Sequence, residues 1–419
     1  MNAYLALLRR QPQFRLLWLA QLVSLLGDWF SAIATVMLVN RYTDSSLAVG
    51  GLFLARSLPP FLVGPLAGLA ADRFSRRTIL VTADLLRAVI VLGFLLVDGP
   101  DRAWLLYALT AAQFMVSAFF EPARAALVPS VVPADDLLTA NVLSSVTWSA
   151  MLSLGAAVGG LVAALLGAPA ALVIDALSFV ISAVLISRLA APPRPTLHTH
   201  AGGWTDLLAG WRYVRTHVHI GVTALVKGLG QLGSVDVLAA VYARRVFPLD
   251  ADGGAALGLM LAFMGVGTVL GPLLGDRLHD GSARSLQRWI AGGYALSASG
   301  WLLVGLAPSL PVALAGWVLR GMGGSINWTY SDVLLQLKVP NHVLGRVYAL
   351  DLAFFTLVAS LGVWSNSLLL DRPAADPRQV AVWLAAAALA ALAAWATALR
   401  VTGGPASAGQ AASGRAAPG

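Results

Sequence analysis

Acidic residues inside long apolar runs are the groups of this sequence best suited to chemistry. Asp28 lies midway along the first run, Asp236 lies in the seventh, and Glu121 lies near the end of the fourth. An ionised side chain at the centre of a membrane helix costs about 2.5 to 3.5 kcal/mol, so it faces the protein interior or a cavity. A carboxylate held there can take up and release a proton. Asp28, Asp236 and Glu121 are therefore the predicted proton carriers, and the alternative for Asp28 is a fixed hydrogen bond to a neighbouring helix.

Cations and aromatic side chains in the same runs are the predicted lining of a binding cavity. Lys227 and Arg320 are expected either to pair with the acids Asp28 and Asp236 or to contact an anionic ligand. Asp84 and Arg87 stand three residues apart on one helix face, so we expect them to form a structural pair. Aromatic residues of membrane helices more often pack or anchor at interfaces, and that alternative stays open for each of them. The cavity candidates are Trp29, Phe30, Arg56, Phe114, Trp148, Lys227, Arg320, Trp328 and Tyr330.

Other chemistries lack the residues that they need. The sequence contains no cysteine, which excludes disulfides and thiolate metal sites. Its six histidines lie between the apolar runs, and their two His-x-His pairs are weak metal signals. There is no glycine-rich loop with a lysine for nucleotide phosphates, and no nucleophile stands with a base. We therefore expect no enzymatic activity, no bound metal and no cofactor.

The elements that must hold these residues are membrane helices. Of the 419 residues, 58% are hydrophobic and 11% are charged, against about 25% charged in soluble domains. The apolar runs do not alternate strictly with polar residues, so barrel strands are not expected. Runs long enough to span a tilted path through a bilayer occur at 14–39, 47–70, 78–97, 103–124, 139–166, 169–188, 219–243, 254–275, 286–307, 310–336, 345–370 and 379–400. The expected fold is an all-α membrane protein with twelve transmembrane helices.

A repeated marker divides the chain into halves. The segment GPLAGLAADRFSRR, Gly64–Arg77, has a shorter counterpart in GPLLGDRL, Gly271–Leu278. A repeat at half the chain length predicts two pseudo-symmetric six-helix bundles. The longest connection has apolar residues at helical spacing from Trp204 to Val214, which is typical of an amphipathic helix on a membrane surface. The expected domains are an N-terminal bundle at 1–188, a cytoplasmic linker at 189–218, a C-terminal bundle at 219–400 and a disordered tail at 401–419.

The distribution of charge predicts the orientation in the membrane. The net charge is +8, but the arginines are spread between apolar runs, so nucleic acid is not an expected partner. Short arginine-rich loops sit on the cytoplasmic side, as Arg76 and Arg77 would, while Asp98 and Asp101 fall on the other side. Only two of the 28 basic residues are lysine, a bias that indicates a GC-rich bacterial genome. We expect a multi-pass protein of the bacterial inner (cytoplasmic) membrane, surrounded by the lipid bilayer, with both termini cytoplasmic and no required oligomer.

The loop after the second run resembles the signature of the major facilitator superfamily. That signature has the form Gly-x-x-x-Asp-Arg-x-x-Arg-Arg, and it is matched by Gly68, Asp72, Arg73, Arg76 and Arg77. A narrower likeness is to the branch that holds bacterial macrolide-efflux proteins and the enterobactin exporter. The motifs that this branch favours are matched by LGD at Leu26–Asp28, FFEPARAALVP at Phe119–Pro129, Ala140 with Asn141, and IDALSF at Ile174–Phe179.

The resemblance implies a gate at the inner membrane surface. In the family, the signature aspartate accepts hydrogen bonds from the amino end of helix 11 and pairs with a basic residue near helix 4. For this chain that implies a latch between Asp72 and the region of Gly345, with Arg124 as a partner. Glu121 is assigned to the same gate in the alternative interpretation of its role. The latch would close the inner side, and the alternative is a loop that only sets topology.

The resemblance also implies a secondary active transporter of a small molecule. Helix 1 lines the cavity in the family fold, which places Asp28 beside it. We expect alternating access and proton-coupled export of an amphipathic compound, such as a drug or a siderophore. Two departures weaken the antiporter pattern: the fourth run has no arginine before Arg124, and Met151 and Ala156 replace a glycine and a proline in the fifth. The alternatives are an importer or facilitator of a small nutrient and a non-transporting membrane receptor or scaffold.

Overall fold

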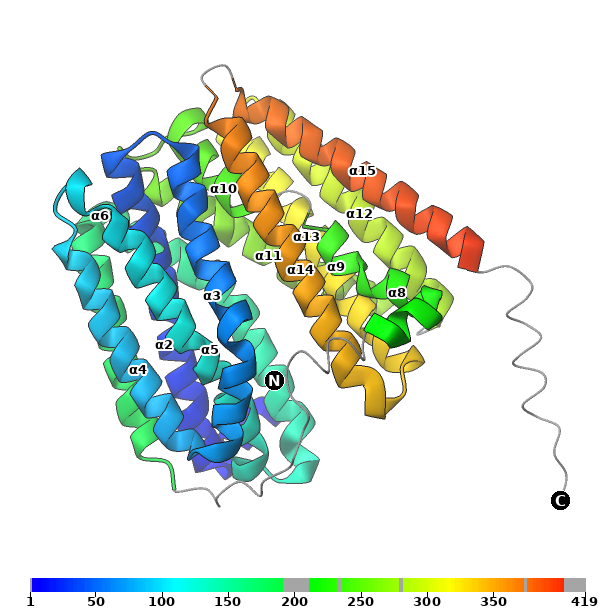
Figure 1. Cartoon of the computed structure of the whole chain (residues 1–419), viewed down its shortest axis with the longest axis horizontal. Helices are drawn as coiled ribbons and strands as arrows, with labels where there is room; N and C mark the ends of the chain where they lie inside the picture. Colours follow the sequence, from blue (N-terminus) through cyan, green and yellow to red (C-terminus); the bar gives the residue numbers. More distant parts are fainter. Residues whose placement is uncertain (1, 191–210, 232–234, 279–281, 373–374, 403–419) are drawn as a thin grey trace, which may run out of the picture.

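The chain folds into long α-helices that run side by side (Figure 1). The computed structural model describes residues 2–190, 211–231, 235–278, 282–372 and 375–402. A short helix, α1 (Asn2–Arg10), precedes the long ones. The helices of the first half are α2 (Pro12–Tyr42), α3 (Ser46–Arg73), α4 (Arg76–Gly93), α5 (Trp104–Val131) and α6 (Leu137–Ser187). Those of the second half are α8 (Val218–Ala224), α9 (Val226–Leu229), α10 (Val235–Val241), α11 (Gly254–Leu278), α12 (Ala283–Leu306), α13 (Leu310–Lys338), α14 (Asn341–Leu370) and α15 (Pro377–Thr402).

Twelve membrane spans follow from these helices. Within the described part of the chain, nine helices are long and apolar enough to cross a bilayer on their own. The 51-residue α6 counts once among the nine but turns back on itself at Gly167, so it supplies two spans. The more polar α13 adds one span, and the short helices α8, α9 and α10 together add another. The all-α fold of twelve transmembrane helices in two bundles, predicted from the sequence, is thereby confirmed.

The turn inside α6 is made by one glycine. Gly167 has φ +83° and ψ 163°, outside the helical region, while the residues on both sides remain helical. L-residues with a side chain rarely adopt a positive φ, so glycine suits this position. The turn falls between the runs 139–166 and 169–188, where the sequence predicts it.

Span 7 differs from its prediction as one continuous helix over 219–243. It is divided into α8, α9 and α10, and a π-helical turn follows at Tyr242–Val246. Glycine lowers helix stability by about 1 kcal/mol relative to alanine, and Gly228 and Gly230 lie at and just beyond the four-residue α9. Hydropathy does not register such breaks, because the whole segment is apolar. Irregular backbone at membrane depth is tolerated only where protein or a water-filled cavity satisfies it.

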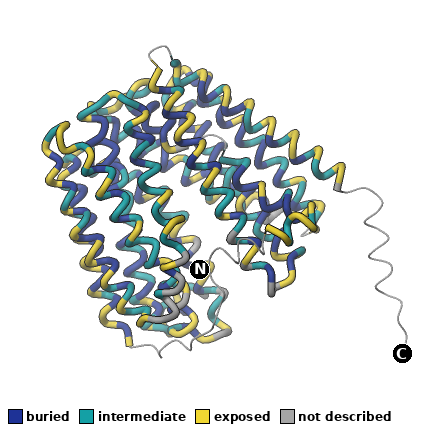
Figure 2. Tube along the Cα trace, viewed as in Figure 1, coloured by how far each residue is buried: buried dark blue, intermediate teal, exposed yellow. Residues whose placement is uncertain are grey.

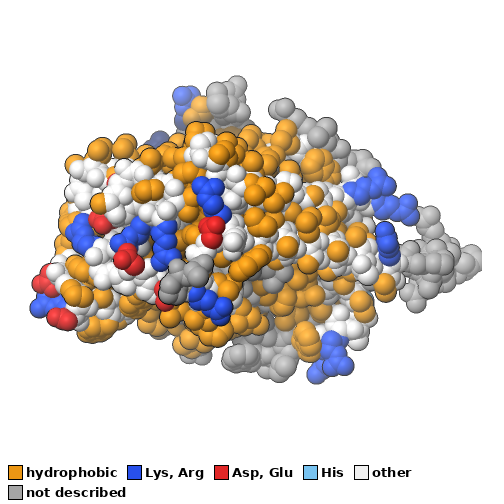
Figure 3. All heavy atoms as spheres, turned by 90° about the horizontal axis from the view of Figure 1, so that it is seen from above, with side chains coloured by type: hydrophobic (Ala, Val, Ile, Leu, Met, Phe, Trp, Pro, Cys, Tyr) orange, Lys and Arg blue, Asp and Glu red, His pale blue; other side chains and the backbone are white. Residues whose placement is uncertain are grey.

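The surface of the bundles is suited to lipid. Large apolar side chains are exposed along the helices, with Leu165 at 72% and Val89 at 68% exposure. Figure 2 shows exposed residues following the outward faces of the helices, and Figure 3 shows apolar side chains over much of the surface. In water such patches would indicate an interaction site; on helices long and apolar enough to cross a membrane they suit contact with lipid.

The two halves are joined by polar contacts at one end of the molecule, here called the closed end. Arg41 Nη2 lies 3.0 Å from Asp252 Oδ2, and Asn40 Nδ2 donates to the carbonyl oxygen of Asp252 at 3.1 Å. Arg244 Nη2 lies 2.7 Å from Asp44 Oδ1. Figure 3 looks onto this end and shows basic and acidic side chains close together. The closed end comprises residues 40–47, 244–254 and 371.

Two further predictions fall partly or wholly outside the described residues. Of the amphipathic segment predicted for the linker, residues 211–216 are helical, and the part before Trp211 lies outside the described residues. The tail at 401–419 lies outside them as well, apart from the last two residues of α15.

Candidate functional site

A group of buried charges in the first half surrounds Arg87 and is here called the Arg87 cluster. Arg87 Nη2 donates to both carboxylate oxygens of Asp28, at 2.7 and 3.0 Å, which links α4 to α2. Its Nη1 donates to Asp84 Oδ1 at 3.2 Å, as the spacing of these two residues predicts. The Arg87 and Asp84 side chains are 5% and 0% exposed, whereas Asp28 is 26% exposed. Asp28 is therefore the member of the cluster with access to solvent.

Asp175, on the second arm of α6, completes the cluster. It is fully buried, accepts a hydrogen bond from Ser178 Oγ at 3.3 Å, and lies close enough to Asp28 and Arg87 to interact electrostatically. Gly27 packs so tightly against Asp175 and Ser178 that a Cβ atom there would overlap them. The sequence predicts a structural role for Asp175. It gives no sign that Asp175 shares a site with Asp28, because the two lie far apart along the chain.

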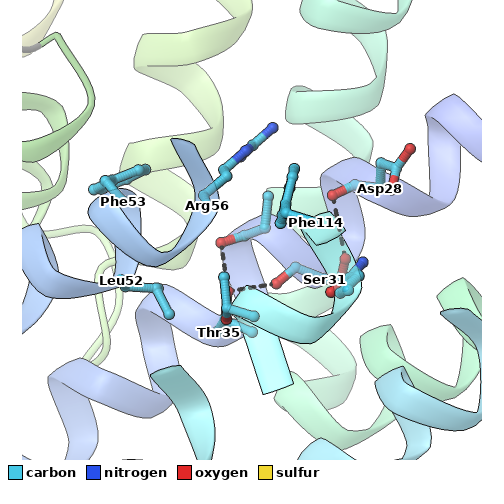
Figure 4. Close-up of a pocket in the computed structure, with 10 residues that line it drawn as sticks. Asp28, Ser31, Thr35, Leu52, Phe53, Arg56 and Phe114 are labelled. Atoms are coloured by element: carbon cyan, nitrogen blue, oxygen red, sulfur yellow. Dashed lines mark hydrogen bonds between the residues drawn. The ribbon is translucent and has the colours of Figure 1, made fainter. Parts of the chain in front are cut away.

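A pocket opens beside the Arg87 cluster. The space between its lining residues, open solvent included, is ≈ 340 Å³. Figure 4 shows Asp28 and Arg56 in its lining, with Arg56 extending beside Phe114. The Arg56 guanidinium lies 4.9 Å from the centre of the Phe114 ring, a cation–π distance. The remaining lining residues are Ser31, Ala32, Thr35, Leu52, Phe53, Thr110 and Gln113.

Asp236, in the second half, lies within electrostatic range of Arg56 of the pocket. It lies in the first turn of α10, its side chain is exposed, and Arg56 and Arg320 are the charged groups that act on it. Arg320 is buried and donates from Nη2 to the carbonyl oxygen of Gly230 at 3.0 Å, one of the carbonyls freed where span 7 breaks. The structure thus places Asp236 within electrostatic range of Arg56 and Arg320, two other predicted site residues, without an ion pair between them among the described contacts.

Lys227 forms a second charged group, in the second half. Its Nζ lies 2.6 Å from Asp332 Oδ1 and 2.5 Å from Asp351 Oδ2. Of the two roles expected for Lys227, the pairing with Asp28 or Asp236 is wrong, because Lys227 pairs with Asp332 and Asp351 instead. The contact with an anionic ligand stays a prediction. Trp328 belongs to the same group, since Lys227 Nζ lies 4.6 Å from the centre of its ring.

The aromatic candidates divide by environment. Trp29 lies against Gly155 and the buried Phe30 lies against Gly159, so both fill the contact between α2 and α6. Tyr330 is 3% exposed and packs in a core with Trp289, 6.2 Å between ring centres. Each of these three residues packs against a glycine of a neighbouring helix. Small residues let membrane helices approach closely, so the three aromatic residues fill helix contacts in this structure.

The other aromatic candidates keep a solvent-accessible or pocket-lining position. Phe114 lines the pocket, as Figure 4 shows. Trp148 and Trp328 are 54% and 41% exposed.

The structure describes the side chains of some of the gate candidates. Gly68, Asp72 and Arg73 lie in the last turns of α3, and their side chains lie outside the described residues. Arg76 begins α4, and Arg77 donates to the carbonyl oxygen of Ser187.

Arg124 pairs with Glu121 within α5. Its Nη2 lies 2.9 Å from Glu121 Oε2, and its Nη1 donates to Gln21 Oε1 at 3.2 Å. Glu121 is 63% exposed, far from the burial expected of an isolated proton carrier, and its pairing agrees with the alternative of a gate residue.

Comparison with protein families gives the decisive observation. A family model described as a transmembrane secretion effector matches residues 3–415. The chain belongs to the major facilitator superfamily. This superfamily match covers both bundles, the Arg87 cluster and the Lys227 group, and it confirms the family resemblance of the signature that ends at Arg77.

Curated relatives within the superfamily are transporters. An MFS-type transporter of Bacillus subtilis (strain 168) is 26% identical over 385 residues, 87% of this chain and 88% of the relative. The enterobactin exporter EntS of Shigella boydii serotype 18 is 24% identical over 360 residues, 83% of this chain and 82% of the relative. The chain is a multi-pass membrane transporter on these grounds.

Solved structures share the fold. A bacterial homolog of the human lysosomal transporter Spinster, in an inward-facing and unoccupied conformation, matches with a TM-score of 0.74 at 15% identity, over 93% of this chain and 97% of its own. The nucleoside transporter NupG matches with a TM-score of 0.69 at 13% identity, over 95% of this chain and 99% of its own. At these identities the likeness shows the fold alone.

Proposed function

We propose that this transporter exports an amphipathic small molecule in exchange for protons, by alternating access between its two bundles. The observation that carries the proposal is the position of Asp28, which joins the buried Arg87 cluster to the pocket. A proton that binds Asp28 changes the charge of a residue that both lines the pocket and holds α2 to α4. Proton binding and the shape of the pocket are therefore linked through one side chain.

The charge balance of the Arg87 cluster supports a proton carrier. Three carboxylates, Asp28, Asp84 and Asp175, surround one guanidinium, so the fully ionised cluster would carry a charge of −2. Uncompensated buried charge is costly, and buried groups neutralise instead. The cluster is thus suited to hold one or more protons, and exchange with solvent would pass through the half-buried Asp28.

The composition of the pocket supports an amphipathic substrate. Leu52, Phe53 and Phe114 give an apolar wall, while Arg56, Gln113 and Asp28 supply polar groups at defined places. Small-molecule sites typically combine an apolar lining with a few polar groups that fix orientation. The likeness to the enterobactin exporter supports outward transport of such a molecule.

The arginine-rich loop at Arg76 and Arg77 supports a cytoplasmic position for the end of the bundle opposite to the closed end. The protein would then lie in the bacterial inner membrane with both termini cytoplasmic and with the N-terminal and C-terminal bundles as its domains. The closed end would face outward, and the structure would represent an inward-open state.

Transport in inside-out membrane vesicles tests the proposal. A panel of amphipathic compounds is screened for uptake with and without an imposed pH gradient, first with the wild-type protein. The variant Asp28→Asn mimics a permanently protonated residue, so exchange of substrate for substrate should survive. Gradient-driven uptake should be lost, because the residue can no longer load and release the driving proton.

The matched control is Asp98→Asn, which also removes one aspartate charge. Asp98 pairs with Arg102 in an exposed loop of the first half, away from the pocket. Its variant should transport like the wild type when rates are normalised to folded protein. Full gradient-driven transport in Asp28→Asn would show that the proton is carried elsewhere, with Asp236 as the next residue to test.

A further inference from the structure

The Lys227 group has a geometry that packing alone does not explain. One ammonium holds two carboxylates from two other helices, Asp332 of α13 and Asp351 of α14, at 2.6 and 2.5 Å. The Lys227 side chain is 5% exposed and the Asp351 side chain 2%, whereas Asp332 is 26% exposed. The group is therefore buried on one side and reaches solvent through Asp332 on the other.

The group is one positive charge short. Lys227 contributes one positive charge and the two aspartates contribute two negative charges, which leaves −1 when all three are ionised. Asp351 Oδ2 is held by Lys227, but the buried Oδ1 of the same carboxylate has no hydrogen-bond partner among the described residues. A buried carboxylate oxygen without a partner carries the full cost of its desolvation. A proton on this carboxylate removes the excess charge.

The charged groups that act on Asp351 are Lys227 and Asp332. The titratable groups that face Asp351 are Lys227, Asp332 and the Tyr348 hydroxyl, which donates to the backbone carbonyl oxygen of Asp332 at 3.3 Å. The Trp328 and Tyr348 rings lie 4.6 and 5.6 Å from Lys227 Nζ, and they stabilise the cation without changing the net charge.

We propose that Asp332, Lys227 and Asp351 form a second proton-binding site, in the C-terminal bundle, which exchanges its proton with solvent through Asp332 during transport. This inference rests on the proposed function as a proton-coupled exporter. No bond other than that to the proton changes: the proton leaves a carboxyl group, and the released carboxylate then shares the Lys227 ammonium. Lys227 lies on the four-residue helix α9, which is set off from α8 at Leu225 and ends just before Gly230.

Infrared difference spectroscopy tests the site without any substrate. Protein purified in lipid nanodiscs is compared at acidic and alkaline pH, in the region of the C=O stretch of a protonated carboxylic acid. In the wild type we expect a band from this site. The band should be lost in Asp351→Asn, and in Asp332→Asn it should be lost or shifted, while Asp98→Asn keeps it. Because Asp351 is buried, Asp332→Asn is the variant to use if Asp351→Asn does not fold.

Asp28→Asn is the second arm of the infrared test. It removes a proton site of the other bundle, so it should leave the band of the Lys227 group in place. Carbonyl spectra of Asp351→Asn and Asp332→Asn that are both identical to the wild type would overturn the proposal.

Vesicle transport then links the site to the cycle. Asp332→Asn should keep substrate exchange and lose gradient-driven uptake. Full gradient-driven uptake in Asp332→Asn would remove the site from the cycle and overturn the proposal. If uptake by the wild type does not depend on the pH gradient, the proposed proton-coupled function is wrong. A failure of the infrared test alone would instead overturn only the second proton site.

Discussion

Gly160 of α6 and Gly258 of α11 touch backbone to backbone across the two bundles. A Cβ atom built on Gly160 would stand 2.8 Å from the Cα of Gly258 and 2.9 Å from the carbonyl oxygen of Gly254. The obstacle is main chain, so no rotamer change relieves it. This pair of glycines therefore sets how closely the bundles approach near the closed end.

Substitution of Gly160 by alanine should open this contact. Overpacking typically costs about 1 to 3 kcal/mol, enough to move a two-state equilibrium several-fold away from the arrangement seen here. Spin labels on cysteines at Leu47 and Leu249, one in each half near the closed end, would report a longer distance in Gly160→Ala. The sequence has no native cysteine to remove first.

Gly292→Ala is the matched control for Gly160→Ala. Gly292 also lies within a helix, α12, but a Cβ atom there meets nothing within 4 Å. Its distance distribution should equal that of the wild type. An unchanged distance distribution in Gly160→Ala would mean that the glycine contact does not set how closely the bundles approach.

The ion pairs of the closed end should tune the same equilibrium. Asp44→Asn and Asp252→Asn each remove one exposed pair across the halves, with Arg244 and Arg41 respectively. Exposed pairs contribute about 0.2 to 1 kcal/mol, so each variant should shift the population about five-fold at most, and the double variant should shift it further. High salt should reproduce part of the effect in the wild type.

The same spin-label distance measures this second prediction. Asp98→Asn removes an exposed pair that lies within one half, and it should have no effect on the distance. A shift as large in Asp98→Asn as in Asp252→Asn would show a general response to lost charge.

Asp72 is proposed to act at the opposite end, where the bundles would close in the other state. Asp72→Asn removes a negative charge that would bind the amino end of α14, an interaction of about 0.3 to 1 kcal/mol when exposed and about 2 when partly buried. The variant should insert normally but lose transport, and a cysteine in the pocket should react faster with a thiol reagent. Asp101→Asn, in an exposed loop, is the control. Wild-type transport in Asp72→Asn would leave the latch without support.

Orientation can be measured with single cysteines. Ser75 is exposed between α3 and α4. Gly99 precedes the short turn Pro100–Arg102, and a Cβ atom built on Gly99 meets nothing within 4 Å. An impermeant thiol reagent should label Gly99→Cys in intact cells and label Ser75→Cys only after the membrane is opened. The reverse pattern would place the arginine-rich loop outside and invert the proposed transport direction.

The sequence predicts the spans well because hydropathy is a local property. The run predicted at 310–336 is the helix Leu310–Lys338, and the turn at Gly167 falls between the two runs that it separates. The breaks of span 7 are missed for the same reason. The hydropathy of a segment is the same whether or not its helical hydrogen bonds are continuous. Gly228 and Gly230 were the available signal.

The site is predicted less completely, because its pairs join distant parts of the chain. Asp84 and Arg87 share a helix, and their pairing follows from spacing alone. The bonds of Arg87 to Asp28 and of Lys227 to Asp351 depend on which helices become neighbours, and a single sequence does not state that. The sequence nevertheless marks Asp28 and Lys227 as candidates, because each is an ionisable group in an apolar run.

The turn at Gly167 has a consequence for how the protein is made. The two arms of α6 are joined by a single non-helical residue, so no soluble segment lies between spans 5 and 6. With so short a connection, we expect the two arms to enter the membrane together as one helical hairpin. Lengthening this turn would uncouple the two insertion events, and it would do so at a place distant from the gate motif at the end of α3.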